Sequence, residues 1–177
     1  TDVKAGRKRG INTTMNFPAL AILDPNFILS CPRNVIASSG MDALTHAIES
    51  FVSKKATLIS RMFSIEAARL LFINLENVLD YPEDLGIKGN LQLGAYLAGI
   101  ALFNSSAGPA GALSYMLGTW YKVPHGAAGA LFLPHIHRFN IENGYYGYVV
   151  LYDALNDAKK GLKTEKEKAE YVIDKIF

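Results

Sequence analysis

The sequence predicts a mainly α-helical bundle, and three observations support this fold class. Apolar residues recur at helical spacing over most of the chain after residue 31. Alanine and glycine are frequent within the long apolar segments, and small residues allow helices to pack closely. Only one short segment, residues 17–23, resembles a β-strand, and a single strand cannot form a sheet by itself. With 177 residues, 50% of them hydrophobic and 19% charged, the chain can form one core.

Residues 1–30 are expected to be loop and strand. The apolar residues 17–23 end at Asp24-Pro25, as a buried strand does when it runs into a turn. Pro32 favours the first turn of a helix. Residues 31–177 are therefore expected to form a helical domain.

Helical periodicity within that domain is clearest from residue 38 onward, where Met41, Leu44, Ile48 and Phe51 form one apolar stripe. The pattern Ser39-x-x-Asp42 predicts a capping box at the start of this helix. Further helices are expected at residues 58–79, 88–103, 109–118, 124–139, 148–157 and 164–177. The small residues of 88–103 predict that this helix is buried at the centre of the bundle.

Composition and charge exclude several classes of protein. The net charge of +2 is too small to indicate a nucleic-acid-binding protein, and we interpret the basic segment 4–9 as a solvated loop or strand edge. Cys31 is the only cysteine, so no internal disulfide can form, which favours a cytoplasmic location. We find no signal peptide and no apolar stretch long enough to span a membrane.

Asp42 and His46 are the first candidate metal ligands. They are four residues apart on one expected helix, so their side chains lie on the same face one turn apart. A carboxylate and an imidazole in this arrangement can bind one divalent metal ion. They can equally be the third residue of a capping box and a partly buried histidine, and the two residues alone favour this structural interpretation.

The other three histidines differ in their surroundings. His125, between Pro124 and Gly126 at a helix start, could be a third ligand or a residue that bonds a nearby carbonyl. His135 and His137 point to different faces of a helix, and we interpret both as structural or exposed. Other motifs are absent: the sequence has no glycine-rich phosphate loop, no G-x-S-x-G elbow and no recognisable base partner for Cys31.

Four short sequences, in order and spacing, resemble the iron-containing alcohol dehydrogenase family. They are Ala21-Ile-Leu-Asp-Pro25, Gly40-Met-Asp-Ala-Leu-Thr-His-Ala-Ile-Glu49, Pro124-His-Gly126, and Leu133-Pro134 leading to Phe139-Asn140. The second is the most specific and is similar to the first metal-binding signature of that family.

The resemblance implies a dehydroquinate synthase-like helical domain, which in this family follows an amino-terminal dinucleotide-binding domain. It places Asp42, His46 and His125 at three of the four metal-ligand positions of the family. The metal would be iron or sometimes zinc, and hydride would pass between an alcohol and NAD(P).

Two positions depart from the family pattern. The family has a histidine fourteen residues before the Pro-His-Gly histidine and a second one four residues after the first. These positions are Gly111, where the fourth metal ligand is expected, and Tyr115, where the family has a histidine beside the substrate. Three protein ligands and a water still make an acceptable catalytic metal site, so metal binding is expected to be weaker but possible.

The glycine-rich half of the family pattern has no counterpart in this sequence. We expect residues 1–30 to be a remnant of the nucleotide-binding domain and the helical domain to be incomplete at its carboxyl end. NAD(P) would then bind only where the other domain is supplied, and the chain alone would not be catalytically competent. The alternative is a non-catalytic helical assembly module. In either case we expect a homodimer, formed through exposed apolar helix faces or through residues 17–23.

Overall fold

The computed structural model describes residues 13–155 and 161–176, and within them the fold is a bundle of seven α-helices with two short 3-10 helices. The α-helices are α1 (Arg33–Val52), α2 (Leu58–Asp80), α3 (Leu85–Phe103), α4 (Pro109–Tyr121), α5 (His125–Glu142), α6 (Val149–Ala154) and α7 (Glu165–Asp174). The 3-10 helices are η1 (Thr14–Asn16) and η2 (Pro25–Ile28). The predicted fold class is confirmed.

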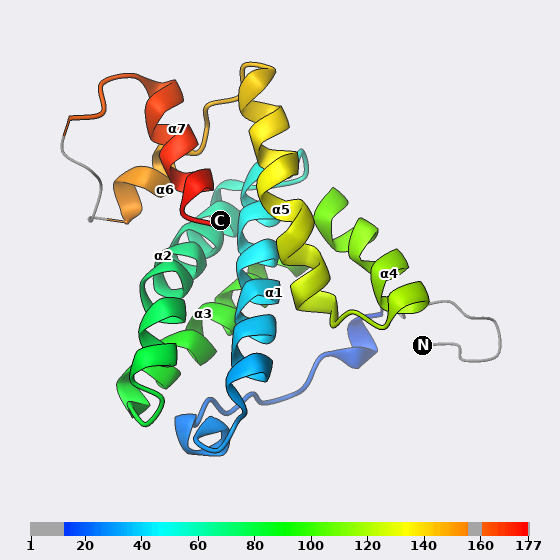
Figure 1. Cartoon of the computed structure of the whole chain (residues 1–177). Coiled ribbons are helices and arrows are strands. Elements are labelled where there is room, and N and C mark those ends of the chain that lie inside the picture. The colour runs from blue at the N-terminus through cyan, green and yellow to red at the C-terminus, as the bar shows by residue number, and fades with distance from the viewer. Residues whose placement is uncertain (1–12, 156–160, 177) are drawn as a thin grey trace.

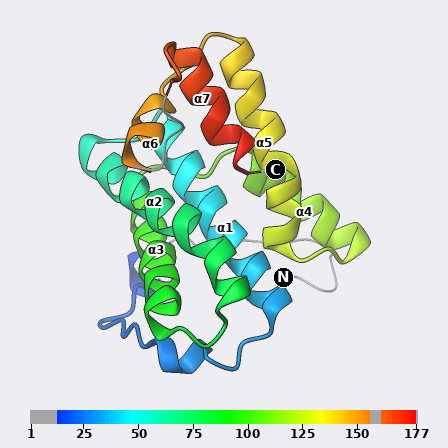
Figure 2. The same ribbon diagram turned by 60° about the vertical axis from the view of Figure 1, so that its left-hand side comes forward.

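Helix α1 is the centre of the bundle. It packs against α2 and α3 on one side and against α5 and α4 on the other (Figures 1 and 2). Its residues Ala47 and Ile48 are fully buried, together with Leu71 of α2 and Leu133 of α5. The prediction that the helix over residues 88–103 lies at the centre was wrong. Helix α3 buries one face only, and its other face leaves Leu93, Tyr96 and Phe103 exposed, among other residues.

Side-chain caps stabilise the first turns of α2, α3 and α7. Thr57 and Ser60 form a reciprocal capping box at the start of α2, Asp84 caps α3, and Thr164 with Glu167 caps α7. The capping box predicted from Ser39 and Asp42 was wrong. Because α1 already begins at Arg33, directly after Pro32, both residues lie inside the helix.

The predicted strand at residues 17–23 is not formed. The segment follows η1 as an irregular chain, and no other strand exists among the described residues to pair with it. Two polar side chains of α3 hold the neighbouring part of the chain. Lys88, which is fully buried, donates to the carbonyl oxygens of Ile28 (2.9 Å) and Leu29 (2.6 Å). Gln92 donates to the carbonyl of Asp24 at 3.1 Å.

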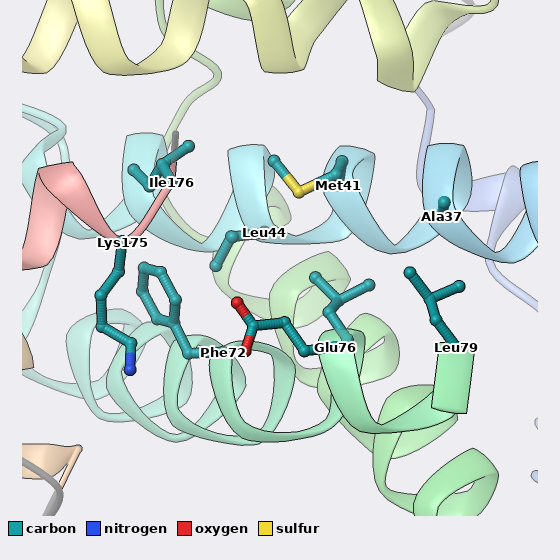
Figure 3. Close-up of a pocket in the computed structure, with 9 residues that line it drawn as sticks. Ala37, Met41, Leu44, Phe72, Glu76, Leu79, Lys175 and Ile176 are labelled. Carbon is teal, nitrogen blue, oxygen red and sulfur yellow. The ribbon is translucent and has the colours of Figure 1, made fainter. Parts of the chain in front are cut away.

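A largely apolar cavity of about 210 Å³ lies between α1 and α2 near the end of α7 (Figure 3). Met41, Leu44 and Phe72 contribute to its wall, and Glu76 and Lys175 are its charged residues. None of the candidate metal ligands lines it, so this cavity does not mark the site predicted from the sequence. Within the described residues, none of the helices has the length and hydropathy needed to cross a membrane. The basic segment 4–9 lies outside the described residues.

Candidate metal centre

The structure brings Asp42, His46 and His125 together on the side of α1 that faces α5. Asp42 Oδ1 lies 4.0 Å from His46 Nε2 and 3.7 Å from His125 Nε2. One donor atom from each residue lies within 4.8 Å of the others, and all three side chains are about a quarter to a third exposed. The helical spacing of Asp42 and His46 predicted their common face, while His125 reaches them from a different helix.

The donor set is suited to a divalent metal. Two imidazoles and one carboxylate are used by both zinc and non-haem ferrous iron, and both metals leave further positions open for water or substrate. Donor atoms bound tetrahedrally at about 2.1 Å lie about 3.4 Å apart. The two carboxylate–imidazole separations, 4.0 and 3.7 Å, are close to this value, and the two imidazole donors lie within 4.8 Å of each other, so side-chain rotations would bring the three atoms to bonding distance. The residues present therefore fit a metal ion.

Close contact between the backbones of α1 and α5 places His125 opposite Asp42. Gly126, the next residue, lies against α1 so tightly that a Cβ atom there would be 1.9 Å from the carbonyl oxygen of Ser38. It would also be 2.9 Å from Cβ of Asp42. Pro124 directly precedes the helix as its N-cap residue. The Pro-His-Gly sequence therefore serves both the helix start and the approach of the two helices.

Glu49, one turn beyond His46 on α1, is a buried carboxylate that sequence analysis did not assign a role. It accepts hydrogen bonds from the backbone N–H groups of Ala110 (2.6 Å), Gly108 (2.9 Å) and Gly111 (3.4 Å), and so caps α4 from another helix. Burial raises the pKa of its carboxyl group, an effect that the three N–H donors and His46 oppose. Glu49 lies on the same side of α1 as Asp42 and His46, so its position along the chain carried no signal that distinguishes a buried carboxylate from an exposed one.

Gly111 and Tyr115, the two departures from the family pattern, lie on α4 beside the site. Gly111 offers no side-chain donor, and its backbone belongs to the first turn that Glu49 caps. The Tyr115 ring stacks on His125 with centroids 5.0 Å apart and planes 13° from parallel. Tyr115 therefore contacts a candidate ligand without occupying a ligand position itself.

The two remaining histidines do not join this cluster. His137 is buried, and its Nδ1 lies 2.6 Å from the Tyr148 hydroxyl, while His135 is exposed. Burial lowers the pKa of His137 to about 4. Both observations agree with the structural or exposed roles predicted for these residues.

Comparison with known proteins places this chain in a family. The sequence pattern described as "Fe-containing alcohol dehydrogenase family, C-terminal" matches residues 36–177. The chain is 34% identical over 176 residues to a 1,3-propanediol dehydrogenase of Citrobacter freundii, covering 99% of this chain and 45% of that protein.

Solved structures agree with this assignment. A 1,3-propanediol oxidoreductase superposes with a TM-score of 0.83 at 32% identity, covering 91% of this chain and 43% of the other. A sulfoacetaldehyde reductase of Bifidobacterium kashiwanohense, solved in complex with NAD+, gives a TM-score of 0.85 at 28% identity, with coverages of 99% and 45%. The chain thus spans less than half the length of these relatives. With four-fifths of its residues inside the match to the C-terminal part, the chain belongs to the iron-containing alcohol dehydrogenase family.

Proposed function

We propose that this chain is the metal-carrying helical domain of an NAD(P)-dependent alcohol dehydrogenase that interconverts an alcohol and its aldehyde by hydride transfer. The convergence of Asp42, His46 and His125 is the observation that carries the proposal. The family assignment and the dehydrogenase relatives support the reaction class. NAD+ in the solved complex of a relative supports the cofactor.

The bound metal, iron or zinc, would act as a Lewis acid on the oxygen of the alcohol or aldehyde. The residues of this chain supply its binding site. Asp42 contributes one negative charge, and the two neutral imidazoles of His46 and His125 contribute none. A divalent ion held by this set therefore keeps a net positive charge toward the substrate oxygen. Helices α1 and α5 fix the three donors from two sides.

NAD(P) binding is proposed to reside in a part of the full protein other than this chain. The sequence has no glycine-rich phosphate loop, and the relatives are more than twice as long as the segment matched here. Holding the nicotinamide against the substrate supplies a large share of the rate enhancement in such a reaction. We therefore expect the isolated chain to show no NAD(P)H-dependent aldehyde reduction, and measurable turnover by it would contradict this division of roles.

Metal analysis tests the site directly. After loading with Zn²⁺ or Fe²⁺ and dialysis, the wild-type chain should retain about one metal ion per molecule. Asp42→Ala and His46→Ala should bind at least about tenfold more weakly, since each removes a donor. Asp80→Ala and His135→Ala remove an exposed acid and an exposed histidine outside the cluster and serve as matched controls. A wild-type chain without metal, or equal binding by all four variants, would remove the basis for the proposal.

A non-catalytic assembly module is the second candidate, and Gly111 and Tyr115 favour it because both replace family histidines. This candidate predicts the same fold with no retained metal. Metal analysis of the wild-type chain therefore separates the two functions.

We further propose that the chain forms a homodimer through exposed apolar side chains. Leu20, Ile22 and Phe27 are 74%, 77% and 84% exposed, respectively, and lie in or next to the segment that follows η1. Burial of apolar area contributes about 25 cal/mol per Å², so covering this surface would favour association. Light scattering should give twice the monomer mass, and Ile22→Lys should shift it toward the monomer. A monomeric wild-type chain at high concentration would contradict the dimer.

A further inference from the structure

The hydroxyl of Ser114 lies between a carbonyl and one of the candidate metal ligands. Ser114, on α4, is completely buried. Its Oγ is 2.6 Å from the carbonyl oxygen of Gly111 and 2.7 Å from Nδ1 of His125. Both distances are those of short hydrogen bonds, so both contacts need a proton between the two atoms.

Hydrogen-bond capacity decides where these protons lie. A carbonyl oxygen can only accept, so the single Ser114 proton must point toward Gly111. The Ser114 oxygen then has only lone pairs to offer His125, and Nδ1 of His125 has to carry a proton. In a neutral imidazole the other nitrogen, Nε2, is consequently the one with the free electron pair. This nitrogen faces Asp42, with Nε2 and Oδ1 3.7 Å apart.

Helix α4 holds the His125 ring in a second way and is itself anchored. The Tyr115 ring stacks against the face of the imidazole at 5.0 Å, which restricts tilting of the ring. The start of α4 is bonded to the buried carboxylate of Glu49, and Glu49 belongs to the same helix as Asp42 and His46. Through these contacts α4 is connected to both helices that carry the candidate ligands.

We propose that Ser114 is a positioning residue that fixes His125 as the Nδ1–H tautomer and directs its Nε2 toward Asp42 and His46. The role in metal binding rests on the proposed function, whereas the tautomer belongs to the metal-free chain as well. Helix α4, which has Gly111 where the family has a ligand, thereby contributes to the site by orienting a ligand of its neighbour. Partners that orient a ligating histidine in this way usually account for 10–100-fold in metal affinity.

Ser114→Ala, compared with the wild-type chain and with Ser64→Ala, tests this role. Ser64 is equally buried on α2, but its hydroxyl has no hydrogen-bond partner among the residues that the structure describes, so its removal controls for the loss of a buried oxygen. Urea unfolding shows that each variant is folded. The first measurement is the ¹H–¹⁵N spectrum of the histidines in the metal-free chain at about pH 8.5, above the ordinary imidazole pKa of about 6.5. The second is zinc affinity by competition with a chelator.

The expected result is an Nδ1–H tautomer of His125 in the wild type and in Ser64→Ala, and its loss or mixture with Nε2–H in Ser114→Ala. Zinc affinity should fall 10–100-fold in Ser114→Ala alone. A wild-type His125 protonated on Nε2 would overturn the proposal, as would an unchanged tautomer and affinity in Ser114→Ala. If the wild-type chain binds no zinc, the proposed function fails, and the spectra still support or overturn the dependence of the tautomer on Ser114.

Discussion

Gly126→Ala should separate the two helices that form the candidate metal centre. The added Cβ would lie 1.9 Å from the carbonyl oxygen of Ser38, and contacts of Cβ atoms with backbone below 3.0 Å are essentially never seen. The difference, 3.0 − 1.9 = 1.1 Å, is the smallest movement that relieves the clash. Because the obstructing atom is helix backbone, rotation of a side chain cannot supply this movement, and the first turn of α5 has to shift.

Two measurable losses should result. Overpacking of this kind usually costs 1–3 kcal/mol of unfolding free energy, and contact with rigid backbone favours the upper end, about 3 kcal/mol. His125 precedes Gly126 directly, so its Nε2 would move away from Asp42 by a similar distance. Because this displacement moves the helix backbone and adds to separations that side-chain rotation already has to close, zinc affinity should fall by at least about tenfold.

Gly129→Ala, one turn further along α5, is the matched control. A Cβ at Gly129 would lie 3.5 Å from Oγ1 of Thr45, an ordinary contact. Replacing an interior helix glycine with alanine should therefore stabilise the chain by about 0.5–1 kcal/mol and leave metal binding unchanged. Urea unfolding and zinc competition measure both quantities. Equal stability and equal zinc affinity of the two variants would refute the argument that Gly126 sets the approach of the helices.

Two further changes follow from the same structure. The pKa of buried His137, about 4 instead of the ordinary 6.5, means that the unfolded chain binds more protons than the folded chain between these values. The contribution of His137 to the unfolding free energy should therefore be complete above pH 6.5 and decrease by about 3 kcal/mol as the pH is lowered to 4. The variant His137→Phe should lose much of this pH dependence, whereas the exposed-site variant His135→Gln should keep it. Gly111→His should raise zinc affinity by about tenfold or more, since a Cβ there meets Glu49 at an acceptable 3.5 Å and the side chain restores a donor at the family's fourth ligand position. Gly111→Ala, which adds a Cβ but no donor, should not raise the affinity in the same chelator competition.

Periodicity in the sequence predicted the helices better than their ends. The apolar stripe of α1 was predicted correctly, but the capping box predicted at Ser39 is not formed, because the helix that begins after Pro32 continues through it. The strand over residues 17–23 failed for a different reason. Local apolar character favours a strand only where a partner strand exists, and the described part of the chain contains none.

The candidate site was predictable in part. The spacing of Asp42 and His46 placed both on one helix face, whereas only the family resemblance associated them with His125. Their proximity depends on the packing of α1 against α5, which periodicity within one helix cannot reveal. Glu49 and Ser114 were not assigned because their partners are backbone groups and a ring nitrogen distant in sequence.

The contacts of Lys88 have a consequence for how the chain meets other molecules. Its ammonium group and the Gln92 amide attach the segment around η2 to α3 through backbone carbonyls, and η2 itself contributes no buried residue. Folded chains usually bury apolar side chains and expose polar groups. In this segment polar hydrogen bonds face α3, while the apolar side chains of Ile22 and Phe27 are exposed. A protein that docks on these side chains would meet a preorganised hydrophobic surface, and the bundle core would not have to open to receive it.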